Sequence, residues 1–197
     1  YIRARYANPD LHISSDGTKM KYQTPTGAPA QVYIPEKVRR LFKSKTPIDV
    51  LFLQEGEKKA EKASKHGMIS LGLQGIMNIG NKEQGLIQSI QEIVKACQVR
   101  HVVLVMDSDW NNLSQNITVG ERADKRPVCF AAAVIKFNQY ISTFHNLQLN
   151  VDAWWGHVNQ NDKGNKGVDD LLVGSLLGRE NAVSYTHLRA HETELHL

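Results

Sequence analysis

Three acidic side chains stand in this sequence at places where carboxylates can hold a metal ion. Glu55 and then Gly56 follow an apolar run, and Asp107 and Asp109 follow another. Residues two apart in an extended segment share a face, so both aspartates can point at one cation. Carboxylates without a His or Cys partner suit a hard ion such as Mg²⁺ or Mn²⁺ rather than zinc. The pattern therefore predicts a divalent-metal site formed by Glu55, Asp107 and Asp109.

These carboxylates are expected at one edge of a parallel sheet. Strand-like and helix-like segments alternate from Pro47 onward, which is typical of a parallel sheet flanked by helices. We expect strands at 48–53, 68–71, 101–106 and 147–155, and helical segments at 57–66, 82–97, 128–144 and 168–177. Open α/β sheets build their sites at the carboxyl ends of strands, where the three carboxylates fall.

The first 46 residues have a different sequence pattern from the rest of the chain, and this pattern predicts a small β-rich extension. Short β-prone pieces are separated there by Asn, Asp, Gly and Pro turn signals. Basic and tyrosine side chains interleave along this stretch, which makes it the first candidate for contact with nucleic-acid phosphates. Among its basic residues we select Arg3, Arg5 and Lys21. Solvated faces of a small sheet would give the same pattern.

Composition sets the broad class. The chain has 197 residues and a formal net charge of +4, so it is mildly basic. Cys97 and Cys129 are far apart in the sequence and predict neither a zinc ribbon nor a disulfide framework. No apolar run reaches the roughly 20 residues of a membrane helix. We expect a cytoplasmic protein that makes no membrane contact.

Both ends indicate a fragment recovered from metagenomic sequence. The chain begins with Tyr1 rather than Met, so its true N-terminus is expected to be missing. The core of residues 181–197, SYTHLRAHET, looks like translated sequencing-adapter read-through and is set aside as an artefactual tail. The expected organisation is an extension at 1–46, an α/β domain at 47–180 and this tail.

The order of these elements resembles a known family. The order runs from an apolar strand and Glu-Gly through a helix, a short strand ending in Gly and a second helix to an apolar strand followed by Asp-x-Asp. This order resembles the Toprim domain of bacterial-type primases, topoisomerases and some nucleases. The chain is most similar to the Toprim-like domains of phage and conjugative-element proteins grouped as domain of unknown function 3854. The supporting segments are 55–60, 73–76, 107–109 and 166–172, preceded by 21–25 and 32–35. The resemblance implies a Toprim-like (Rossmann-like), mostly parallel four-stranded sheet.

The resemblance also implies roles for individual residues. Glu55 would act as general acid/base or metal ligand, and Asp107 and Asp109 would hold Mg²⁺ or Mn²⁺. Asp169 would add a further carboxylate, although a helix-capping role explains this residue or its neighbour Asp170 equally well.

The chain departs from the primase pattern at two places. Primases usually carry an acid where this chain has Lys59, and an Ala-Gly pair where it has Asn111 and Asn112. Lys58 and Lys59 could instead meet phosphate, although a charge run on a helix is usually a solvated face. The departures leave open a site that binds without catalysing.

Three functions compete at this point. The leading expectation is a Mg²⁺-dependent nucleic-acid-processing domain of a DNA replication protein, with nucleotidyl transfer of the primase or primase-helicase type. Its partners would be single-stranded DNA or RNA, nucleotides, and a helicase domain or partner in the full-length protein. The alternative is a catalytically degenerate single-stranded DNA-binding module of a mobile-element replication protein. A haloacid-dehalogenase-like phosphatase also uses Asp-x-Asp, but there it lies on an early strand, and Asn111 stands where that family has Thr or Val.

Overall fold

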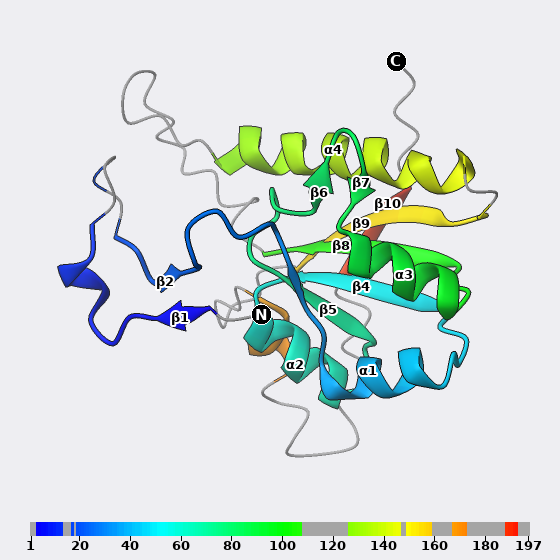
Figure 1. Cartoon of the computed structure of the whole chain (residues 1–197), viewed down its shortest axis with the longest axis horizontal. Helices are drawn as coiled ribbons and strands as arrows, with labels where there is room; N and C mark the ends of the chain where they lie inside the picture. Colours follow the sequence, from blue (N-terminus) through cyan, green and yellow to red (C-terminus); the bar gives the residue numbers. More distant parts are fainter. Residues whose placement is uncertain are drawn as a thin grey trace.

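A mixed β-sheet forms the centre of the molecule (Figure 1). The computed structural model describes residues 3–13, 17, 19–107, 126–146, 149–158, 167–172 and 188–192. Across the sheet the strand order is β10-β9-β8-β4-β5-β3. The strands are β3 (Val32–Tyr33), β4 (Val50–Glu55), β5 (Ser70–Leu73), β8 (His101–Met106), β9 (Asp152–Val158) and β10 (Leu188–Glu192).

Four of these strands are parallel and confirm the expected sheet. β4 pairs in parallel with β5 and with β8, and β8 pairs in parallel with β9. The sheet is wider than expected, because β3 adds to β5 and β10 adds to β9, both antiparallel. β10 lies in the segment set aside as a tail. It pairs with β9 at the edge of the sheet, where an open strand offers free backbone groups to another extended segment.

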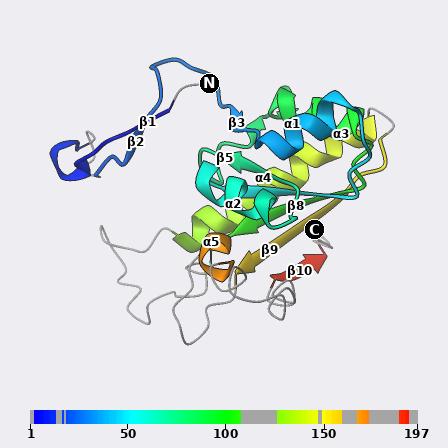
Figure 2. The ribbon, with the colours of Figure 1, turned by 90° about the horizontal axis from the view of Figure 1, so that it is seen from below.

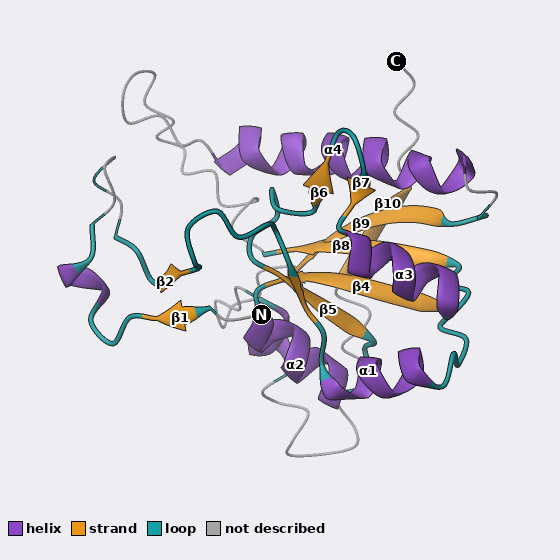
Figure 3. Cartoon of the chain, in the orientation of Figure 1, coloured by secondary structure: helices purple, strands orange, loops and turns teal. Residues whose placement is uncertain are grey.

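Helices cover both faces of the sheet (Figures 1 and 3). They are α1 (Glu36–Lys43), α2 (Glu57–Lys65), α3 (Gln88–Ala96), α4 (Arg126–Asn146) and α5 (Val168–Leu171). Alternation along β4 separates two cores: Leu51 and Leu53 join the larger cluster with α3 and α4, whereas Phe52 packs on the smaller cluster with α2 and α5. The chain is therefore an α/β protein with helices on both sides.

The N-terminal segment contains the expected small antiparallel β structure, together with two elements that join the rest of the molecule. β1 (Ala4–Arg5) and β2 (Tyr22–Gln23) pair as a small antiparallel sheet that projects away from the rest, with a 3₁₀ turn at Pro9–Leu11 between them (Figures 1 and 2). β3 instead belongs to the central sheet. α1 was not expected. Five of its eight residues are charged, and they mask the helical spacing of Val38, Leu41 and Phe42, which pack on the core.

Two expected helices have other bounds. The segment before α3 forms a hairpin of β6 (Gly80–Asn81) and β7 (Gly85–Leu86), so the helix begins at Gln88 rather than at residue 82. The Asn81 side-chain oxygen accepts hydrogen bonds from the backbone N–H groups of Glu83 (3.0 Å) and Gln84 (2.8 Å), which closes the turn. α5 ends at Leu171, and residues 173–177 of the expected helix lie outside the described residues. Within the described part of the chain, no helix is long and apolar enough to cross a membrane.

Candidate functional site

The candidate site lies where the order of the parallel strands reverses. The chain passes from β4 to its neighbour β5 and then crosses back to β8 on the other side of β4. Open α/β sheets bind ligands at such a switch point, beyond the carboxyl ends of the strands. Glu55 is the last residue of β4, and Asp107 directly follows β8. The structure thus brings these two predicted site residues to the same edge of neighbouring strands.

Two glycines set the beginning of α2 at this edge. Gly56 has φ +107° and ψ +147°, a conformation that is essentially restricted to glycine. Its N–H donates to the carbonyl oxygen of Leu73 at 2.9 Å. A Cβ on Gly72 would lie 2.9 Å from the Cα of Glu57, so only glycine at this position of β5 lets α2 start so close to the sheet.

An ion pair joins α2 to the end of β8. The Nζ atom of Lys59 donates to both carboxylate oxygens of Asp107, at 2.5 and 2.6 Å. The side chains are 20% and 11% exposed, respectively. An ion pair so well shielded from water is screened less than a surface pair. Lys59 was expected to face phosphate; in this structure it neutralises Asp107 instead.

The short helix α5 packs against the same lysine. A Cβ on Gly167 would lie 2.7 Å from Cε of Lys59, so the lysine passes directly over this glycine. Lys62, one turn further along α2, donates from Nζ to the backbone carbonyl of Asp169 at 2.8 Å. The carboxylate of Asp170 accepts the N–H of Gly167 at 2.9 Å, which caps α5. The capping alternative therefore holds for Asp170.

Asp169 lies beside the Lys59–Asp107 pair. Its Oδ1 atom and Nζ of Lys59 both lie within 3.2 Å of the position that a Cβ on Gly167 would take. Lys59 is therefore bound to Asp107, and Asp169 shares with it the space beside Gly167. Of the residues predicted to hold metal, Asp107 is paired with this ammonium group and Asp169 lies nearby at the start of α5.

Glu55 approaches the edge from the other face of the sheet. The register pairs Gln54 with Val105, so Glu55 lies one position beyond that pair and Asp107 two positions beyond it. Strand alternation places Glu55 on the face of Leu53, whereas Asp107 is on the face of Val105, toward α2. Although β4 and β8 are neighbours, the carboxylates of Glu55 and Asp107 therefore lie on opposite faces of the sheet.

The described residues do not fit a divalent ion at Asp107. Both of its carboxylate oxygens already contact an ammonium group. Over the described ranges, no three His, Cys, Asp or Glu side chains are grouped closely enough to hold a metal ion. Asp109 lies outside those ranges, as do Asn111 and Asn112.

Arg3 was expected to contact phosphate but has a structural role. Its guanidinium donates to Oε1 of Glu57 (2.7 Å) and to the backbone oxygen of Gln74 (3.3 Å), and its Cζ lies 4.4 Å from the centre of the Tyr22 ring. Only 17% of the Arg3 side chain is exposed. Arg3 thereby holds the β1–β2 hairpin against the first turn of α2.

The other expected phosphate contacts are accessible. Arg5, Lys21 and Lys58 are exposed, Arg5 and Lys21 on the hairpin and Lys58 in the first turn of α2. Because Arg3 joins these two segments, the three side chains lie on neighbouring parts of the molecule.

One buried polar group was missed from the sequence. Gln54, only 1% exposed, has a side-chain amide nitrogen without a hydrogen-bond partner in the described structure. A polar residue near the end of an apolar strand was the available signal, since a buried amide normally finds a partner.

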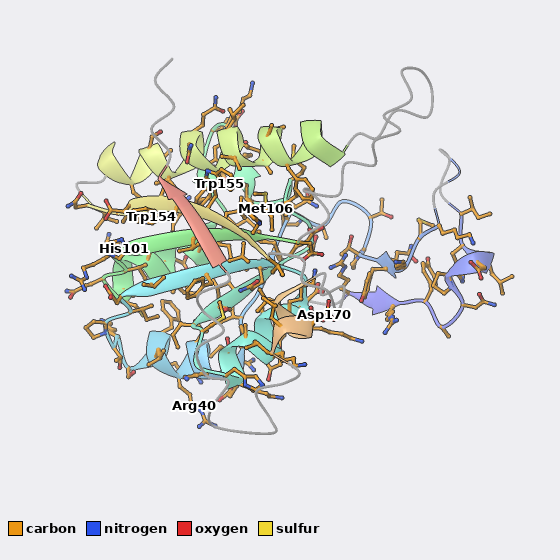
Figure 4. The ribbon with its side chains drawn as sticks, turned by 180° about the vertical axis from the view of Figure 1, so that it is seen from behind. Arg40, His101, Met106, Trp154, Trp155 and Asp170 are labelled. Carbon is orange, nitrogen blue, oxygen red and sulfur yellow. The ribbon has the colours of Figure 1, made fainter. Side chains whose placement is uncertain are left out.

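Trp154 of β9 lies toward the amino ends of the parallel strands. Figure 4 shows His101 and Trp154 toward one end of the sheet and Asp170 toward the other. Trp154 Nε1 donates to Nδ1 of His101 at 3.3 Å, at the amino end of β8. Trp154 therefore lies away from the carboxyl-end site.

Comparisons with known proteins leave the family open. No family model, no curated protein and no solved structure matches the chain. The Toprim-like interpretation therefore depends on the motif order and on the residues at the strand ends.

Proposed function

We propose that this chain is a Toprim-like domain that handles nucleic acid within a replication protein of a phage or other mobile element. The observation that carries the proposal is that Glu55-Gly56 ends β4 and Asp107 follows β8 at the switch point between these two neighbouring strands. This is the position at which an open α/β sheet binds a ligand. The motif order and the exposed basic side chains of the hairpin and of α2 support nucleic acid as that ligand.

The geometry favours a binding module of the mobile-element type over a metal-dependent enzyme. Lys59 supplies the positive charge at Asp107, so this carboxylate is neutralised without a divalent ion. Arg5, Lys21 and Lys58 provide accessible cations for a phosphate backbone, and nucleic-acid affinity depends strongly on such charges. Single-stranded DNA or RNA is the proposed partner, presented to a helicase or polymerising activity elsewhere in the full-length protein.

The second candidate is Mg²⁺-dependent nucleotidyl transfer of the primase type. It is favoured by one observation: Glu55 and Asp107 occupy the ends of the two strands that flank the switch point. In this candidate Asp109 would complete the ligand set. Primer synthesis with Mg²⁺ or Mn²⁺ on single-stranded DNA, abolished in Asp107→Asn, would establish the enzyme over the binding module.

Binding is tested with fluorescently labelled single-stranded DNA and RNA by anisotropy over a range of salt concentrations. The double variant Lys21→Gln/Lys58→Gln should bind about tenfold more weakly and reduce the salt slope by about 2, because each lost phosphate contact removes about one unit. The matched control is Lys43→Gln/Lys95→Gln. These lysines are also exposed but lie in the last turns of α1 and α3, which lead to the amino ends of β4 and β8.

The control should change affinity by less than about twofold, although it removes the same net charge. Equal losses in both double variants, or no binding by the wild type at low salt, would contradict the proposed function.

A further inference from the structure

We propose that Lys59 is the built-in cation of the Asp107 site and that a divalent ion binds there only after Lys59 is displaced. The proposal deepens the proposed function, because it assigns the regulation of the same site. Its test is a metal titration without nucleic acid, so the two proposals can fail separately.

The first argument is the completeness of the contact. Nζ of Lys59 lies 2.5 and 2.6 Å from the two oxygens of Asp107. An ammonium that contacts both oxygens of one carboxylate occupies the place that a cation chelated by this carboxylate would take. A divalent ion binding Asp107 must therefore compete with a charge that is covalently part of the protein.

The second argument is that the surroundings hold Lys59 in place. α2 is fixed at the sheet by the close approach at Gly72 and is joined to α5 by the hydrogen bond from Lys62 to the carbonyl of Asp169. The lysine reaches Asp107 by passing over Gly167, where a side chain would displace it. The backbone of Gly167 has φ −119° and ψ 172°, which other residues readily adopt. The contact with Lys59 and Asp169, rather than backbone strain, therefore favours glycine at this position.

The test is a Mn²⁺ titration of the full chain, followed by the electron paramagnetic resonance of free Mn²⁺. The wild type should bind Mn²⁺ at this site only at about millimolar concentration, in the range of weak carboxylate sites. Lys59→Gln should bind at least about tenfold more tightly, because one close charge changes a carboxylate's affinity for a cation by one to three orders of magnitude. The gain should disappear in Lys59→Gln/Asp107→Asn.

Lys65→Gln is the matched control. Lys65 is on the same helix and is also paired with a carboxylate, Glu61 at 3.3 Å, but its side chain is 71% exposed. The variant has the same net charge as Lys59→Gln and should change Mn²⁺ affinity by less than about twofold.

A second variant displaces the lysine without removing a charge. Gly167→Ala places a Cβ against Cε of Lys59 and Oδ1 of Asp169, two flexible side-chain ends that can move. It should also tighten Mn²⁺ binding, by a smaller factor, and it provides the test if Lys59→Gln does not fold by circular dichroism.

Three outcomes would overturn the inference. The first is wild-type Mn²⁺ binding that is tighter than about 10 μM and is lost in Asp107→Asn. The second is equal Mn²⁺ affinity of Lys59→Gln and Lys65→Gln. The third is a gain in affinity in Lys59→Gln that persists in Lys59→Gln/Asp107→Asn. If the expected Mn²⁺ pattern is found but the wild type binds no single-stranded DNA or RNA, the proposed function fails and the role of Lys59 stands.

Discussion

Lys59 of α2 contacts both carboxylate oxygens of Asp107, a residue 48 positions away at the end of β8. The contact connects α2, the helix that follows β4, to the end of β8, which lies next to β4 in the sheet on the side opposite β5. It adds to other links between α2 and its surroundings, among them the Lys62 contact to α5 and the close approach of Glu57 to Gly72. The pair therefore has a structural role as well as an electrostatic one.

Removing the acid of this pair should destabilise the fold. Asp107→Asn leaves the Lys59 ammonium partly buried without its counter-charge, and we expect the free energy of unfolding to fall by about 1–3 kcal/mol, between the values for exposed and fully buried pairs. Urea denaturation followed by tryptophan fluorescence measures the loss. Asp49→Asn is the control, since Asp49 pairs with Arg100 where the two side chains are 59% and 70% exposed. It should cost less than about 1 kcal/mol, and equal losses would contradict the account.

The sequence predicted the four parallel strands but not the use of Lys59. The buried apolar runs give the strands directly, because parallel strands covered on both faces have near-continuous hydrophobic runs. Spacing places Asp107 at a strand end, yet it cannot reveal which basic side chain reaches it, because that depends on the packing of α2 and α5. The contacts of Arg3, which the sequence predicted to meet phosphate, were hidden for the same reason. Its burial depends on Glu57 and Gln74, which lie more than fifty residues away.

The glycines around α2 should differ in how far they tolerate alanine. Gly72→Ala pushes a Cβ to 2.9 Å from the backbone of Glu57, which has no flexible end that can yield, so we expect a loss of about 1–3 kcal/mol in the free energy of unfolding. Gly56→Ala should cost a similar amount through its backbone conformation. Gly167→Ala meets only side-chain ends and weakens the Lys59–Asp107 contact without removing either charge, so it should cost less than Asp107→Asn and less than Gly72→Ala. Equal losses at Gly72 and Gly167 in urea denaturation would refute this order.

Arg3→Ala should release the N-terminal hairpin. The guanidinium supplies the two hydrogen bonds and the aromatic contact by which the hairpin is joined to α2 and Gln74. Hydrogen–deuterium exchange should speed up in peptides that cover 3–6 and 19–23, because local opening no longer breaks these contacts. In the control Arg5→Ala, the lost side chain is exposed and its Cζ lies 6.0 Å from the Tyr22 ring centre, so exchange should change little. Faster exchange throughout the central sheet in Arg3→Ala would instead indicate global destabilisation.

Tyr33 should make the fold less stable at alkaline pH. Burial raises the pKa of its phenol, and the hydrogen bond that it donates to Glu61 at 3.0 Å raises it further. Below the ordinary tyrosine pKa of about 10, both folded and unfolded chains keep this proton. At higher pH the unfolded chain loses it first, so the stability that Tyr33 contributes declines as pH rises through the folded pKa. Urea denaturation from about pH 8 to about pH 11 should show a steeper decline for the wild type than for Tyr33→Phe, and parallel declines would contradict the assignment.

The two cysteines should differ in their reaction with iodoacetamide. Cys97 is fully buried at the end of α3, its thiol lies 3.7 Å from the carbonyl oxygen of Leu41, and burial raises its pKa. Cys129 of α4 is exposed. Because the thiolate is the reactive form and must be reached by the reagent, Cys129 should react at least about tenfold faster in the native protein. Mass spectrometry of tryptic peptides gives both rates, and unfolding in urea should bring them together. Equal rates under native conditions would mean that Cys97 is accessible and that the contact between α1 and the end of α3 opens readily.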